Sequence, residues 1–286
     1  MSRLTDTPID KPSASVETQP IPLLSVYDLQ FGLASDPGRV RERNEDACLA
    51  MQFMLAQHGE DPLPVGLFLV ADGMGGHAGG QEASALAARL VARHIMQQVH
   101  LPLLSDEDEA ATRAPINEVL ENGVRIAHDT LVRRLPTSGT TLTVALVLGE
   151  GLYIAHVGDS RAYIGERGSL KLVTRDHSMA ARLLEMNQTT LEAASMQRNI
   201  LYKALGQGSR VDPDILYHDL YPGQYLLLCC DGLWDMVSDE EISAIVEASS
   251  TPGSACRKLV TRANENGGED NISVIVAARV WPLPAF

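Results

Sequence analysis

The sequence predicts an α+β fold in which antiparallel sheets are covered by pairs of helices. Seven apolar, β-branched runs bounded mostly by Gly, Asp or Asn are typical of strands, and they span 47–55, 66–71, 140–148, 152–157, 161–164, 225–230 and 272–280. Two helix pairs interrupt these strands, one after the second strand and one before the last. Because this order lacks the regular strand and helix alternation of a doubly wound sheet, we expect antiparallel pairing.

The helices are predicted from apolar spacing and from capping residues. After the second strand, small and apolar residues from Ala83 to Val91 share one helical face, and Pro115 opens a second helix. Near the C-terminus, Ser238 and Glu241 form a capping-box pattern, and the Pro that follows Thr251 begins a further helix. At least one helix of each pair therefore has a clear start signal.

Two segments differ from the rest of the chain. Residues 1–22 are rich in Pro, Ser, Thr and charge without periodicity, which predicts a disordered tail before a single domain over 23–282. Residues 174–214 are polar and Met-rich, with helical spacing at 181–184 and again at 200–205, and they interrupt the strand series. We expect this segment to be an insertion over a functional face.

Composition excludes several classes of partner. A net charge of −14 on 286 residues disfavours binding to nucleic acids and to anionic membranes. The four cysteines lack zinc spacing, which suggests a reducing compartment, and no signal peptide or long apolar run is present. The prediction is a monomeric cytoplasmic protein that binds neither nucleic acid nor membrane.

Acidic residues recur where predicted strands begin or end. Three apolar strands end in an aspartate beside a glycine, and two further acidic sites precede the first and last long strands. These five sites are Asp72-Gly73, Gly158-Asp159, Asp231-Gly232, Glu45-Asp46 and Asp270-Asn271. A carboxylate at the end of a buried strand is costly to desolvate unless it is paired or binds a cation. Any one site alone could be only a turn, but their repetition favours ligands.

The chemistry of these sites predicts the metal. If the strand ends converge, the carboxylates repel one another by roughly 3 kcal/mol per pair at about 5 Å and an effective dielectric of about 20. Cations would have to compensate. Because all candidate ligands are oxygens and none is a thiolate, we expect two hydrated Mn²⁺ or Mg²⁺ ions instead of zinc.

Six ordered segments resemble the PPM (protein phosphatase 2C) family of metal-dependent serine/threonine phosphatases, in its bacterial branch. They are RERNED at 41–46, ADGMGGHAGG at 71–80, SGTT at 138–141, VGDSR at 157–161, CDGLWD at 230–235 and EDNIS at 269–273. The resemblance implies a four-layer α-β-β-α sandwich of two antiparallel sheets flanked by helix pairs. It also implies that the metals lie at one edge and that 174–214 is a mobile flap beside them.

The resemblance assigns metal ligands residue by residue. Asp72 would bridge both tightly bound ions, and the carbonyl of Gly73 would bind one of them. Asp231 and Asp270 would bind the other ion. Asp46 would be a ligand or would support a ligand from outside the coordination sphere.

The remaining assignments concern the reaction. Asp159 would join Asp231 in holding a third, weaker ion. Arg41 would bind the substrate phosphate, for which its planar fork is suited, and Glu45 would hold metal-bound water. Arg41 and Glu45 are therefore the candidate catalytic residues. The implied mechanism is direct attack at phosphorus by a water that bridges the two ions, without a phosphoenzyme.

The acid that protonates the leaving group stays open. In animal members of the family a histidine directly follows Asp-Gly, whereas here Met74 takes that place and His77 comes three residues later. Either His77 or a metal-bound water could donate the proton.

Two other functions fit part of this pattern. A nuclease or phosphodiesterase would use a similar oxygen-ligand centre, but the acidic net charge argues against it. A non-catalytic signalling module would keep the fold, but the intact acidic set and Arg41 argue against that. The expected partners are phosphoproteins and an opposing serine/threonine kinase.

Overall fold

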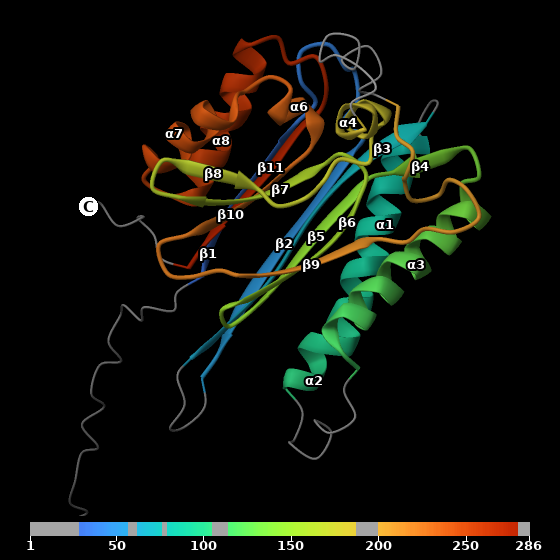
Figure 1. Cartoon of the computed structure of the whole chain (residues 1–286), viewed down its shortest axis with the longest axis horizontal. Helices are drawn as coiled ribbons and strands as arrows, with labels where there is room; N and C mark the ends of the chain where they lie inside the picture. The colour runs from blue at the N-terminus through green and yellow to red at the C-terminus, as the bar shows by residue number, and fades with distance from the viewer. Residues whose placement is uncertain (1–28, 57–61, 76–78, 105–113, 187–199, 280–286) are drawn as a thin grey trace, which may run out of the picture.

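The predicted layers are confirmed in the computed structural model, which describes residues 29–56, 62–75, 79–104, 114–186 and 200–279 (Figure 1). Two antiparallel sheets stack between two layers of helices. The five-stranded sheet has the order β1 (Gln30–Asp36), β11 (Ile272–Ala278), β10 (Tyr225–Cys229), β7 (Arg161–Glu166) and β8 (Ser169–Leu172). The six-stranded sheet contains β2 (Asp46–Leu55), β3 (Leu63–Gly75), β5 (Leu142–Leu148), β6 (Gly151–Val157) and β9 (Asp214–Asp219), with β4 (Ser138–Thr140) paired to β3.

A helix pair covers the outer face of each sheet. The helices α1 (Gly79–Ile95) and α3 (Ile116–Arg134) pack on the six-stranded sheet, and α7 (Asp239–Glu247) and α8 (Pro252–Glu265) pack on the five-stranded sheet (Figure 1). The shorter helices are η1 (Met96–His100), α2 (Leu101–Leu103), α4 (Met179–Glu185) and α6 (Asp231–Trp234). The predicted cap is confirmed, since the Ser238 hydroxyl accepts a hydrogen bond from the N–H of Glu241, a contact typically worth about 1 kcal/mol. None of the helices in the described ranges is long and apolar enough to cross a membrane.

The sheets are buried on both faces, which explains the near-continuous apolar strands. Along β3, Leu67 and Leu69 pack toward α1 and α3, while Phe68 and Val70 pack between the two sheets. A third core lies between the five-stranded sheet and α7 and α8. Because successive side chains on a strand point to opposite faces, each central strand supplies two cores.

One secondary-structure prediction was wrong, and three strands were not predicted. The helical spacing at 200–205 forms no helix, because Leu201 and Leu205 instead make isolated antiparallel bridges with Ser178 and Thr140. Strands β1, β8 and β9 were not predicted, since they lie at or beside sheet edges, are only partly buried and lack long apolar runs. In both cases pairing with a distant strand overrides local propensity. The predicted tail at 1–22 and residue His77 lie outside the described residues.

Candidate metal centre

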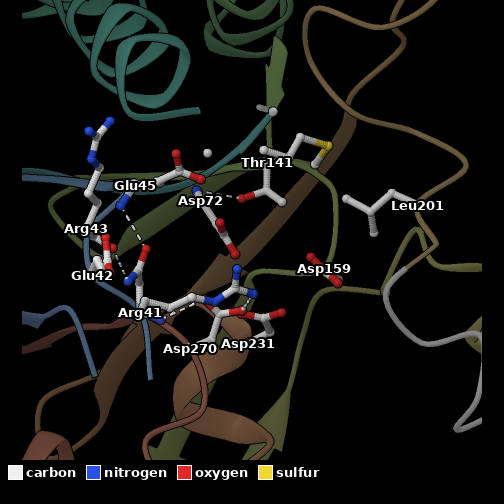
Figure 2. A pocket seen from close by; sticks show the side chains of 14 residues that line it. Arg41, Glu42, Arg43, Glu45, Asp72, Thr141, Asp159, Leu201, Asp231 and Asp270 are labelled. Atoms are coloured by element: carbon white, nitrogen blue, oxygen red, sulfur yellow. Dashed lines mark hydrogen bonds and ion pairs between the residues drawn. The ribbon is translucent and has the colours of Figure 1, made fainter. Parts of the chain in front are cut away.

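Strand ends and loops from both sheets meet at a pocket of about 580 Å³ (Figure 2). Asp72 comes from the end of β3, Asp159 follows β6, Asp231 follows β10 and Asp270 precedes β11. The residues that line it are Arg41, Glu42, Arg43, Glu45, Asp72, Gly73, Met74, Gly75, Thr141, Asp159, Leu201, Asp231, Asp270 and Asn271. Seven of the eight predicted site residues therefore come together here, and Asp46 lies outside the lining.

Asp46 and Asp72 are neighbours on adjacent strands. They are direct partners in the antiparallel register of β2 and β3, which places their side chains on one face. Both carboxylate oxygens of Asp46 are buried, without a hydrogen-bond partner among the described residues. Burial raises the pKa of Asp46 to about 7; the nearby side chains of Ser273 and Cys230 oppose this rise, and repulsion from Asp231 and Asp270 adds to it. Burial and repulsion from Asp231 and Asp46 likewise raise the pKa of Asp72 well above its ordinary value.

Asp231 and Asp159 extend this crowded set of carboxylates. One oxygen of Asp231 is buried and has no hydrogen-bond partner within the described part of the chain. Burial, followed by repulsion from Asp270, raises the pKa of Asp231 to about 6. Burial and repulsion from Asp231 raise the pKa of Asp159 to about 8. Without a cation, ionising these side chains is therefore costly.

Gly73 is required by close packing at the end of β3. A Cβ at this position would lie 2.1 Å from the carbonyl oxygen of Gly80 and 2.6 Å from that of Glu45. The same packing places the Glu45 carboxylate beside the start of α1, where the helix dipole favours negative charge, since a Cβ on Gly80 would be 2.8 Å from Glu45 Oε2. The N–H of Glu45 also donates to Asn271 Oδ1 over 2.7 Å.

Arg41 stands at the rim of the pocket and points toward Asp270 and Asp231 (Figure 2). Its Nη2 donates to Asp270 Oδ2 over 2.7 Å, and its side chain is 56% exposed. The negative charge of Asp270, with smaller contributions from Asp231 and Asp72, raises the pKa of Arg41. A guanidinium at the rim can meet an anion that enters the pocket from solvent.

Thr141 and Asn271 hold the site together. From the sequence, Asn271 was expected to orient the neighbouring ligand or to form a turn, and Thr141 was given no role. Thr141 Oγ1 accepts the N–H of Asp72 over 2.9 Å and shares a 2.7 Å hydrogen bond with the Ser160 hydroxyl. The amide of Asn271 donates to the carbonyls of Pro37 and Arg43. For Thr141 the only sequence signal was its place in a segment that matches the family, whereas Asn271 was also marked by its position directly after Asp270.

The donor set fits hard, partly hydrated divalent ions. In the described ranges, no group of three or more His, Cys, Asp or Glu side chains is close enough, as placed, to hold a metal ion. The acidic side chains that line the pocket are nevertheless hard oxygen donors, and both carboxylate oxygens of Asp46 and Oδ1 of Asp231 are buried without a hydrogen-bond partner among the described residues. Mg²⁺ and similar ions keep several water ligands, and these can span from an ion to a more distant carboxylate.

A cysteine nucleophile has a sequence match that the structure rules out. Cys256 and Arg262 have the Cys-x5-Arg spacing of cysteine-dependent phosphatases. Cys256, however, lies inside α8 in the core beneath the five-stranded sheet, with no exposed surface. Burial raises the pKa of this thiol to about 12, so it carries no reactive thiolate near neutral pH.

Comparisons with known proteins agree on one family. The model of the family described as protein phosphatase 2C matches residues 39–265. The serine/threonine phosphatase stp of Listeria monocytogenes is 35% identical over 86% of this chain and 94% of its own length.

Solved structures agree with this match. The serine/threonine phosphatase PstP/Ppp of Mycobacterium tuberculosis superposes with a TM-score of 0.71 at 32% identity, covering 87% of this chain and 98% of that one. The catalytic domain of PstP in complex with two manganese ions superposes with a TM-score of 0.67 at 30% identity, covering 87% and 97%.

Proposed function

Because this chain belongs to the protein phosphatase 2C family, we propose that it hydrolyses phosphoserine and phosphothreonine in proteins and requires Mn²⁺ or Mg²⁺. The observation that carries this proposal is a pocket with four aspartates in its wall and Arg41 at its rim. A cation site beside an anion-binding guanidinium is the combination that phosphate-ester hydrolysis needs. The substrates would be phosphoproteins made by a serine/threonine kinase. A cytoplasmic location and a monomeric state stay predictions.

The pocket lining is consistent with the ligands that the family resemblance implies. Asp72, Asp231 and Asp270, with the carbonyl of Gly73, would hold the ions. Asp46 would act from behind Asp72, because it does not line the pocket. Its buried charge would help to hold the ions by electrostatic attraction.

The chain's own residues would orient the reactants. When bound, the ions would lower the pKa of a water molecule, and their positive charge would stabilise the transition state. Arg41 would leave Asp270 and bind two phosphoryl oxygens, and Glu45 would accept a hydrogen bond from the attacking water. The hydroxyl of Thr141 is already engaged by Asp72 and Ser160, so it would not act as a nucleophile. This arrangement favours direct attack by water without a phosphoenzyme.

Substrate choice tests the proposal. Peptides of one sequence that differ only in carrying phosphoserine, phosphothreonine or phosphotyrosine should be hydrolysed with at least about a tenfold preference for the first two. Phosphate release by the Mn²⁺-loaded enzyme measures this. A tenfold preference for phosphotyrosine would contradict the assignment. Faster hydrolysis of bis(p-nitrophenyl) phosphate than of p-nitrophenyl phosphate would favour the phosphodiesterase alternative.

Replacing Arg41 should mainly weaken phosphate recognition. Arg41→Ala should lower kcat/KM by about 100-fold on a phosphothreonine peptide, because two charge-assisted hydrogen bonds are lost. Arg41→Lys should recover only part of this, since an ammonium cannot make the planar two-point contact. Arg43→Ala is the matched control, because Arg43 lines the same pocket, and it should change kcat/KM by less than about threefold. Equal losses in both alanine variants would remove Arg41 from its role.

A further inference from the structure

The turn that carries Asp159 is clamped from two sides. Gly158 has a φ of +110°, and a Cβ there would lie 2.6 Å from Thr141 Cβ, so the chain turns tightly against the start of β5. Asp159 is only 7% exposed, yet it lines the pocket. The position of its carboxylate therefore depends on what holds the main chain at 158–159.

His177, at the start of the predicted flap, holds one side of this turn. Its ring Nδ1 accepts a hydrogen bond from the N–H of Gly158 over 3.0 Å, and the main-chain N–H of His177 donates to the carbonyl of Gly158 over 2.7 Å. Its Nε2 lies 3.1 Å from Asp214 Oδ2, and Asp214 Oδ1 accepts from Lys203 over 2.7 Å. Since Nδ1 accepts, the proton sits on Nε2 and the imidazole is neutral. Both polar main-chain groups of Gly158 are thus fixed by one residue that is 1% exposed.

Trp234 holds the other side. Its indole N–H donates to the carbonyl of Asp159 over 3.1 Å, and it is the last residue of α6, the helix that begins with Asp231. The guanidinium of Arg161 stacks 3.6 Å above the Trp234 ring and donates to both carboxylate oxygens of Asp176, at distances from 2.7 to 3.3 Å. Asp176 immediately precedes His177. The contacts of His177 and of Trp234 with the turn are therefore both connected to the start of the 174–214 segment.

We propose that His177 and Trp234 are positioning residues that set the affinity of a divalent ion bound by Asp159. The base of the 174–214 segment would thereby control how fully that ion's site is occupied. This inference rests on the proposed metal-dependent function. A purely structural role would predict lower stability in the variants without selective loss of one ion.

The test compares two substitutions of His177. His177→Leu removes the acceptor for the Gly158 N–H, whereas His177→Asn keeps a carbonyl oxygen near the position of Nδ1. Mn²⁺ binding is measured by the electron paramagnetic resonance of free Mn²⁺, together with the Mn²⁺ concentration that half-activates p-nitrophenyl phosphate hydrolysis. His177→Leu should lower the affinity for the most weakly bound Mn²⁺ by about tenfold or more and leave the affinities for the two tightly bound ions unchanged. At saturating Mn²⁺ its kcat should return to the wild-type value. His177→Asn should return both readouts toward wild type.

His128→Leu is the matched control. His128 is also 1% exposed and its Nδ1 also accepts a glycine N–H, but that glycine is Gly206, away from the turn at 158–159. His128→Leu should leave the Mn²⁺ titration unchanged, even if the substitution lowers the stability of the protein. An equal weakening in both leucine variants would overturn the inference in favour of a general loss of stability.

Trp234→Phe tests the other support and serves if His177→Leu fails to fold. It keeps an aromatic ring beneath Arg161 and removes the donor to Asp159 together with part of the ring volume, so it should also lower the affinity for the third ion by about tenfold. Unchanged Mn²⁺ affinity in the folded variants, or a wild-type protein that binds only two ions, would overturn the inference while metal-dependent turnover stands. A wild-type protein without metal-dependent turnover would instead overturn the proposed function.

Discussion

Removal of divalent metal should abolish phosphate release. Four of the aspartates at the site have pKa values raised by burial and mutual repulsion, and only a cation lets them ionise together at low cost. In EDTA, turnover of p-nitrophenyl phosphate should fall by more than about 1000-fold, a loss of about 4 kcal/mol in transition-state stabilisation. Added Mn²⁺ or Mg²⁺ should restore it, and inhibitors of the okadaic acid type should have no effect.

The metal content must be measured in the same sample. Elemental analysis of the EDTA-treated and dialysed protein gives the residual metal, and thermal melting shows that the fold survives. Mn²⁺ should also raise the melting temperature, because a ligand that binds only the folded state stabilises it by mass action. Full activity in a verified metal-free sample would refute the proposed mechanism.

Asp72→Ala and Asp231→Ala should each abolish turnover while leaving the protein folded. Each substitution removes a proposed ligand, so kcat should fall by about 1000-fold or more even at high Mn²⁺. Asp129→Ala, an exposed substitution on α3, is the control and should change neither activity nor melting. Wild-type turnover in either site variant would refute its assignment as a ligand.

The same variants should stabilise the metal-free fold. The direction in which the stability changes with pH follows from the raised pKa values of the aspartates. The pKa of Asp231 is about 6 in the folded chain, above the value of about 4 in an unfolded one, so the folded state binds more protons between these values. The stability of the metal-free wild type should therefore fall as pH rises from about 4 to 8, where Asp46 and Asp159 also ionise. In Asp231→Ala this fall should be smaller, as melting in EDTA at several pH values would show.

The segment 174–214 shows how a local pattern can mislead. The spacing at 181–184 correctly predicted α4, yet similar spacing at 200–205 belongs to residues that bridge to Ser178 and Thr140. Periodicity reports which residues avoid water. It does not report whether a residue is covered by its own helix or by a distant strand.

The sequence by itself determined the layers and the chemistry of the site. Apolar runs and helical spacing follow from burial of each element. An aspartate at the start or end of a buried apolar strand is costly to desolvate, and the sequence alone shows where this occurs. Asp72, Asp159, Asp231 and Asp270 were found in this way, and they do meet in one pocket.

Only the tertiary structure decided which of these residues line the pocket and which lie outside it. The register of β2 and β3 sets Asp46 opposite Asp72, and packing leaves Asp72 in the pocket wall and Asp46 outside it. The contact between Trp234 and Asp159 joins residues 75 positions apart, and no local pattern encodes it. Such contacts depend on the registers of several strands at once. A one-residue slip of a strand would turn its side chains to the opposite face, and the strand's own sequence cannot exclude that slip until its neighbours are in place.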